Sequence, residues 1–96
     1  MIMFAVKEAR NQLENKRFVI TLRKHRRKTG RNYYNYYRGD IKRGIVSIIY
    51  LSNMEGHEEN LKSFVAGSGF KTLEEWLEKA KDARFLYKVK LIEKFD

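Results

Sequence analysis

The chain has 96 residues, enough for one domain over residues 1–96 with a single modest core, and its 43% hydrophobic and 14% aromatic content excludes a disordered chain. It contains no cysteine, which excludes disulfides and thiolate metal sites, and its longest apolar runs are too short to span a bilayer. The net charge of +9 is unevenly distributed, because residues 1–50 hold 13 Lys and Arg against 3 Asp and Glu, whereas residues 51–96 hold 8 against 9.

A one-sided positive charge indicates a polyanionic partner, because like charges repel one another in a compact domain. We therefore expect nucleic acid to be the partner, rather than a membrane. A generally charge-rich surface would explain the mixed second half of the chain but not the basic first half. The opening sequence MIMFAVKEAR lacks the features of a secretory signal, so we expect a cytoplasmic protein. We also expect it to be a monomer. Nothing in the sequence calls for a cofactor.

The first half of the chain predicts a helix, a strand and a basic loop. Apolar residues recur at helical spacing between Phe4 and Glu14. The segment KRFVITLRK, residues 16–24, alternates in a way that predicts a strand with one buried face. Basic residues and Gly30 then precede NYYNYY, residues 32–37, and RGD at residues 38–40 predicts a turn.

The second half predicts two strands with helices between them. Residues 43–53 are nearly continuously apolar and β-branched, as in a central strand. Two helices follow, the first ending in the glycines of residues 67–69, the second capped by Thr72 with Trp76 in its buried stripe. Residues 84–95 alternate as a closing strand. Because no regular crossover helices separate the strands, we expect a small mixed barrel or an α+β sheet rather than a doubly wound fold.

The basic segment has the composition of a nucleic-acid surface. Lys and Arg neutralise phosphates and release counterions, and aromatic faces stack on unpaired bases. If residues 32–37 are extended, Tyr34 and Tyr36 share one face and Tyr33 and Tyr37 the other, so that one pair enters the core. We expect the first pair to meet bases. The predicted nucleic-acid-binding residues are Arg23, Lys24, Arg26, Arg27, Lys28, Arg31, Tyr34, Tyr36, Arg38, Lys42 and Arg43.

The chain resembles an ASCH domain, a PUA-like β-barrel family associated with RNA. Thr21-Leu22-Arg23, after a helix and Lys16-Arg17, is similar to the family's K-x-x-T-x-R element, and Gly39-Asp40-Ile41 is similar to its G-D-[IV] turn. The strand GIVSIIYLSN, the helix in SGFKTLEEWLEKA and the closing strand FLYKVKLI resemble the remainder. The resemblance implies a PUA-like barrel with an N-terminal helix and two further helices before the last strand. It also implies a cleft beside the first helix that binds RNA or a modified nucleoside.

Two rival functions remain open. An RNA-processing enzyme, either a nucleoside amidohydrolase or a ribonuclease, would use Lys16, Thr21 and Arg23 in the same cleft. However, Phe18 stands where the family has its lysine, and no catalytic glutamate has a match. A DNA-binding protein of a mobile element is the other alternative, because phosphates of RNA and DNA look alike to arginine. His25 and His57 are the only histidines and show no ligand spacing, so no metal site is expected.

Overall fold

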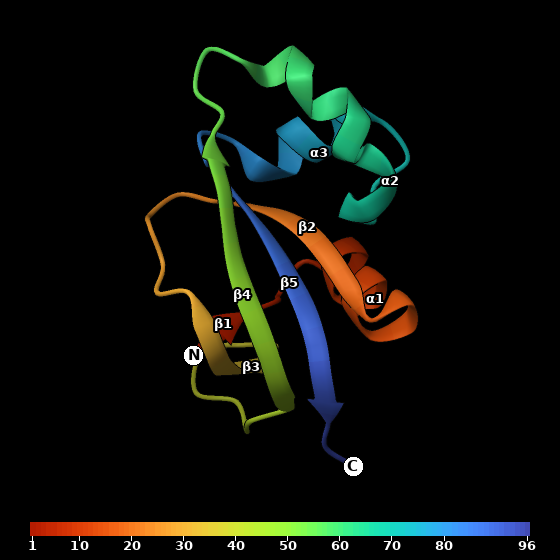
Figure 1. Cartoon of the computed structure of the whole chain (residues 1–96). Coiled ribbons are helices and arrows are strands. Elements are labelled where there is room, and N and C mark those ends of the chain that lie inside the picture. The colour runs from red at the N-terminus through yellow and green to blue at the C-terminus, as the bar shows by residue number, and fades with distance from the viewer.

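Five strands form one curled, mixed sheet in the computed structural model, which describes all 96 residues (Figure 1). The strands are β1 (Ile2–Met3), β2 (Phe18–Arg23), β3 (Gly30–Asn35), β4 (Gly44–Asn53) and β5 (Phe85–Lys94), in the spatial order β1-β3-β4-β5-β2. Only β1 and β3 pair in parallel, and the other neighbours are antiparallel. The apolar run of β4 occupies the middle of the sheet, as predicted. The result is a small α+β half-barrel whose edge strands are β1 and β2.

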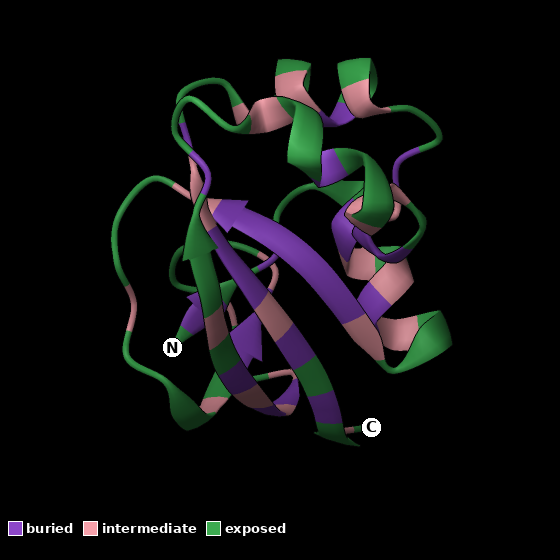
Figure 2. Ribbon diagram, turned by 45° about the horizontal axis from the view of Figure 1, so that its top comes forward, coloured by how far each residue is buried: buried purple, intermediate pink, exposed green.

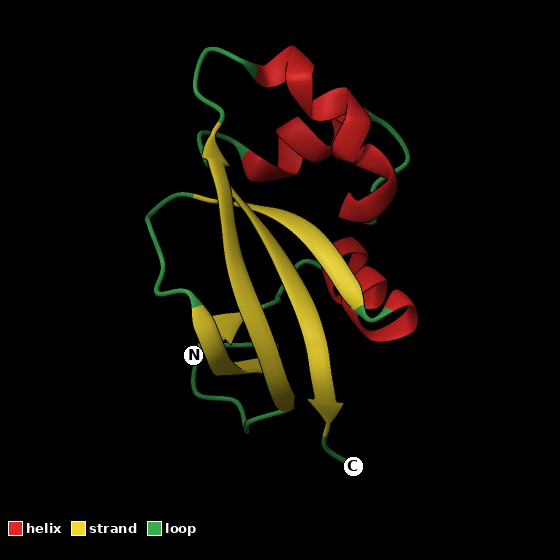
Figure 3. Ribbon diagram, viewed as in Figure 1, coloured by secondary structure: helices red, strands yellow, loops and turns green.

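Helical segments pack mainly against β2, with the first beside it and the others at the end of the sheet where β4 finishes (Figure 3). They are α1 (Lys7–Lys16), the 3-10 helix η1 (Glu58–Phe64), which continues into α2 (Val65–Ser68), and α3 (Leu73–Ala80). The two helices predicted before the last strand are confirmed, as is the Thr72 cap, whose Oγ1 accepts the Glu75 N–H at 3.1 Å. The first helix begins at Lys7 rather than at Phe4, because residues 2–4 instead bond to β3, with Phe4 N 2.8 Å from Asn35 O.

Two apolar clusters lie on opposite faces of the sheet. On the first face, here called the α1 face, α1 and β1 cover Val19, Tyr34 and Val89. On the second, the α3 face, the later helices cover Ile20 and Leu86, which join the core around Trp76. Strand β2 is therefore buried on both sides over residues 19–22 (Figure 2), and the prediction of one buried face was wrong. The cause is tertiary, because the second helical layer lies against the face that local alternation assigned to solvent.

The glycines at residues 67–69 position this second layer. Gly69 ends α2 with φ of +90°, and a Cβ atom there would lie 2.2 Å from the carbonyl oxygen of Glu8 in α1. A Cβ atom on Gly67 would lie 2.8 Å from Cγ1 of Ile20 in β2. The absence of side chains therefore allows α2 to approach both α1 and β2 closely. Residues 67–69 thus lie at the C-terminal end of a helix, as predicted.

Candidate nucleic-acid interface and a neighbouring pocket

The four tyrosines of residues 32–37 form two pairs on opposite sides of the chain, as expected. However, Tyr34 and Tyr36, the pair predicted to meet bases, point toward the interior of the protein. Tyr34 is fully buried, and its hydroxyl donates to Glu14 Oε2 at 2.8 Å. Tyr36 donates to the same oxygen at 2.5 Å, and its ring lies against the guanidinium groups of Arg10 and Arg43, with Cζ 4.5 and 4.3 Å from the ring centroid. Burial and the hydrogen bond to Glu14 raise the pKa of both phenols, which keeps them as donors.

Tyr33 and Tyr37 are the tyrosines that face solvent, with 39% and 55% of their surface exposed. The prediction that Tyr34 stacks on bases was therefore wrong, and the exposed aromatic faces belong to its neighbours. The physical reason is that β3 packs its even-numbered side chains against α1, and the alternation alone does not say which face is covered.

Two of the predicted phosphate contacts are structural instead. Arg23 Nη1 donates to the carbonyl oxygen of Met3 at 2.7 Å, and Arg27 Nη2 donates to that of Met1 at 2.6 Å. These arginines come from β2 and the loop after it, whereas the carbonyls belong to β1 and the residue preceding it. The two edge strands of the half-barrel are thus joined by side chains across a gap, which we call the seam.

Arg43 is also engaged within the chain. Its guanidinium forms a two-bond ion pair with Asp40, from Nε at 3.0 Å and Nη2 at 3.1 Å. The same carboxylate accepts the backbone N–H groups of Ile41 and Tyr36 at 2.8 and 3.2 Å. Residues 37–40 form the predicted turn, with Asp40 N bonded to Tyr37 O at 3.0 Å. Asp40 therefore holds the turn, and Arg43 is not free for phosphate.

We expect the contribution of this turn to the stability of the protein to depend on pH, through the carboxyl group of Asp40. The hydrogen bonds from Arg43, assisted by those from Tyr36 and Ile41, lower the pKa of Asp40 below its usual value of 3.8. A lowered carboxyl pKa stabilises the folded state above the unfolded pKa, and the effect is lost as the pH falls through the folded pKa. Asp40→Asn should therefore lower the melting temperature at pH 7, and the difference from the unchanged protein should shrink below pH 4. Melting curves from pH 7 to pH 2 check this; a constant difference would contradict it.

Six of the predicted cations are exposed and reach solvent around the loop after β2, strand β3 and the turn: Lys24, Arg26, Lys28, Arg31, Arg38 and Lys42. Only one of them pairs with a carboxylate, since Lys24 Nζ lies 3.7 Å from Asp82 and both side chains are largely exposed. Two others lie on aromatic rings, with Arg26 Cζ 4.4 Å from the centroid of Tyr50 and Lys42 Nζ 4.1 Å from that of Tyr33. This positive charge is therefore not neutralised within the chain.

The α3 face of the sheet adds two lysines that the sequence interpretation had not assigned to the surface. Beyond the helical layer, strand register aligns Arg31 with Ser47 and Ser47 with Lys90, and it places Lys88 beside Ile49 on the same face. Tyr33 lies on this face too, because it is on the opposite side of β3 from Tyr34. The alternation within β5 already separated the lysines from the apolar residues, and this signal is enough to find them.

On the α1 face, a polar hollow of about 260 Å³ lies next to the loop after β2. Arg26, Arg27 and Lys28 line it, together with Asn32, Ile48 and Met1. The three cations predicted to form a loop tip are thus gathered around one concavity. The loop is fixed at its centre, since Arg27 N donates to the Tyr87 hydroxyl at 2.7 Å.

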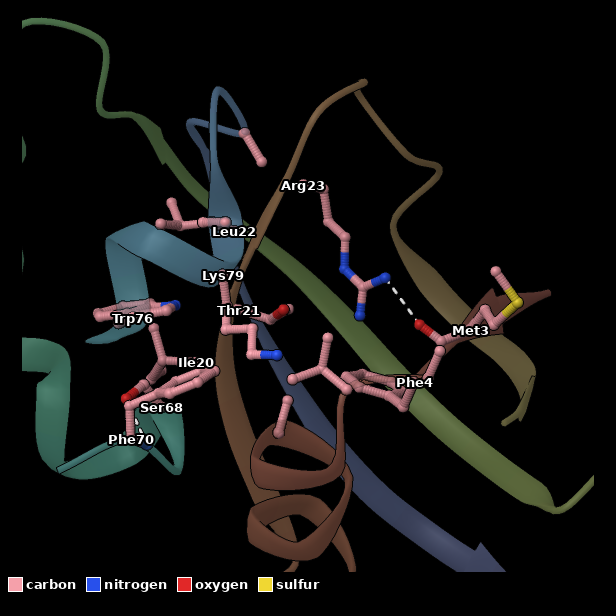
Figure 4. Close-up of a pocket in the computed structure, with 15 residues that line it drawn as sticks. Met3, Phe4, Ile20, Thr21, Leu22, Arg23, Ser68, Phe70, Trp76 and Lys79 are labelled. Atoms are coloured by element: carbon pink, nitrogen blue, oxygen red, sulfur yellow. Dashed lines mark hydrogen bonds between the residues drawn. The ribbon is translucent and has the colours of Figure 1, made fainter. Parts of the chain in front are cut away.

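A second, mostly apolar cavity of about 220 Å³ lies where the seam meets the helices (Figure 4). It lies beside the start of α1 and is lined by Thr21 and Arg23 of β2 and by Lys79 of α3. Lys16 does not line it, because it is an exposed residue at the far end of α1. The structure therefore brings together two of the three residues named for an enzyme, and no carboxylate or histidine lines the cavity.

Lys79 was missed because the sequence interpretation of the second predicted helix considered only its cap and its apolar stripe around Trp76. Its position three residues after Trp76 places both side chains on one side of α3, and this spacing could have identified Lys79 from the sequence.

The chain contains no cluster of three or more His, Cys, Asp or Glu side chains that would hold a metal ion. None of its helices is long and apolar enough to cross a membrane. No protein-family model, no curated protein and no solved structure matches the chain significantly.

Proposed function

We propose that the protein binds RNA through two surfaces that share strand β3: the hollow on the α1 face, which Asn32 of β3 lines, and the open α3 face of β3, β4 and β5, which carries Arg31. The observation that carries this proposal is the excess of exposed Lys and Arg over carboxylates there. Of the six exposed predicted cations, only Lys24 has an acidic partner. A surface of this kind gains affinity by releasing counterions from a nucleic acid, with little dependence on sequence.

Single-stranded RNA is the favoured ligand because aromatic side chains lie among the cations. The ring of Tyr33 shares the α3 face with Arg31 and is adjacent to Lys42, and Tyr37 is exposed at the following turn. Exposed rings of this kind stack on unpaired bases, which double-stranded DNA does not offer. Lys88 and Lys90 of β5 add two more positive charges to this face.

We further propose that the half-barrel is a PUA-like domain of the ASCH type. Three features support the assignment: the Asp40-centred turn in the Gly39-Asp40-Ile41 motif, the cavity beside α1, and the presence of Thr21 and Arg23 in its lining. Amidohydrolase chemistry is not part of the proposal, because the cavity lacks a carboxylate and Lys16 lies elsewhere.

Fluorescence anisotropy with labelled single-stranded RNA, double-stranded RNA and double-stranded DNA of equal length tests the function. We expect the single-stranded RNA to bind most tightly, with an affinity that falls steeply as salt rises. A variant with Lys28, Arg31 and Lys90 changed to alanine should flatten the slope of log K against log salt by about 2, since each lost contact to a single strand removes about 0.7. Tightest binding to double-stranded DNA would overturn the proposal in favour of a DNA-binding protein.

The matched control changes Lys7, Lys62 and Lys71 to alanine. These lysines are exposed on or between the helices, and their loss lowers the net charge by the same amount. We expect the control to retain most of the slope. Equal losses in both variants would show that only total charge matters, and no binding of any ligand near physiological salt would refute the proposed function.

A further inference from the structure

The cavity at the seam contains an arginine whose hydrogen-bonding capacity is only partly used. Arg23 Nη1 is occupied by the Met3 carbonyl, but Nε is buried and has no hydrogen-bond partner. The guanidinium is fixed over the ring of Phe4, with Cζ 4.6 Å from the ring centroid. The edge formed by Nε and Nη2 is therefore held in place and left without a protein acceptor. Two parallel N–H donors of this kind match the two oxygens of a carboxylate.

The surroundings of this edge favour an anion. Figure 4 shows the ammonium group of Lys79 turned into the space between Thr21 and Phe4. The Thr21 hydroxyl makes no hydrogen bond within the chain, although the residue is only 7% exposed. No carboxylate of the protein lines the cavity to neutralise the two cations. Burial, together with the positive charge of Arg27, lowers the pKa of Arg23 to about 10, so it remains protonated at neutral pH without its charge being balanced.

The remainder of the cavity is apolar. Its walls include the side chains of Phe4, Ile20, Phe70 and Trp76, which come from four different segments of the chain. The volume of about 220 Å³ lies below the roughly 300–1,000 Å³ typical of sites for drug-sized ligands, so the occupant is small. Apolar walls with a few convergent polar groups at one end are typical of sites that orient a small amphiphilic molecule.

We infer that this cavity binds a small molecule with one carboxylate and an aromatic or branched apolar body. The carboxylate would accept from the Nε–Nη2 edge of Arg23, with Lys79 and Thr21 completing its coordination, and the body would lie between Phe70 and Trp76. This site is separate from the RNA surface and does not depend on RNA binding.

Titration of the full chain with benzoate, followed by amide chemical shifts, tests the inference. Benzoate should perturb residues of β2 and α3 with a dissociation constant in the millimolar range or below, and its neutral isostere benzamide should bind at least about tenfold more weakly. Phenyl phosphate, cytidine and cytidine monophosphate form the comparison arms. Equal affinity for benzoate and benzamide, no saturable binding of benzoate, or tighter binding of any comparison ligand would overturn the carboxylate site.

Three variants make the test specific. Arg23→Gln should weaken benzoate binding at least about tenfold, and Lys79→Met, on an exposed helical position, should weaken it several-fold. Arg27→Gln is the matched control, because it breaks the other arginine contact across the seam but does not line this cavity. Because the charge of Arg27 also acts on Arg23, this variant should weaken benzoate binding slightly, but far less than Arg23→Gln does. If Arg27→Gln loses affinity as much as Arg23→Gln, the arginines act only by holding the seam, and the site is refuted. RNA affinity should survive Arg23→Gln.

Discussion

Gly69→Ala is expected to remove about 3–5 kcal/mol from the free energy of unfolding, a large part of the roughly 5–14 kcal/mol typical of a domain this size. Two costs add. The backbone at residue 69 has φ of +90°, which an L-residue adopts only with strain, and the new Cβ atom would meet the Glu8 carbonyl oxygen at 2.2 Å and its carbon at 2.8 Å. Backbone cannot rotate aside as a side chain can, so α1 and α2 must separate. Urea unfolding measures the loss.

Gly56→Ala is the matched control for this prediction. Gly56 also has a positive φ, of +79°, but a Cβ atom there meets nothing within 4 Å. Its replacement should cost only the conformational strain, about 1–2 kcal/mol. The difference between the two variants isolates the contact between α2 and α1. Equal losses would mean that this contact does not determine the stability of the helical layer.

Tyr34→Ala is expected to destabilise the protein by about 3–5 kcal/mol, because it removes a fully buried ring from the core on the α1 face. Tyr34→Phe retains the ring and should cost less, about 1.5–3 kcal/mol, which is typical of a hydrogen bond to a carboxylate such as that of Glu14. Urea midpoints of the two variants separate the packing contribution from that of the hydroxyl.

The neighbouring substitution Tyr33→Ala should behave in the opposite way. This ring is 39% exposed, so its loss should change stability by less than about 1 kcal/mol while weakening single-stranded RNA binding by about 1–3 kcal/mol. If Tyr34→Ala instead leaves stability unchanged and abolishes RNA binding, the assignment of the two faces of β3 is wrong.

The order and type of most elements were predictable because they depend on local patterns. The apolar run of β4, the alternation of β5, the Thr72 cap and the glycine ending at residue 69 each carry a signal within a few residues. Strand β1 was missed because two residues have no period, and they become a strand only by pairing with Tyr34 and Asn35. Its formation depends on a contact more than thirty residues away along the chain.

The candidate sites were harder to predict. The net charge of a segment indicates the class of its binding partner, but it does not show which side chains contact that partner and which form contacts within the protein. A count of positive residues could not separate Arg31, which is exposed, from Arg23 and Arg27, which bind carbonyls of the opposite edge. Likewise, alternation placed Tyr33 and Tyr34 on opposite faces but could not say which of these α1 would cover. Such distinctions depend on tertiary packing, which the local sequence does not encode.

The side-chain closure between the edges of the sheet has a consequence for motion. A barrel closed by strand pairing opens only when several ladder hydrogen bonds break together, whereas here Arg23 of β2 bonds to Met3 and Arg27 of the following loop bonds to Met1, in both cases through a side chain. The two edges can therefore separate locally at this junction, at a free energy far below that of global unfolding. Transient parting there would admit a ligand to the interior while the central strands β4 and β5 remain intact.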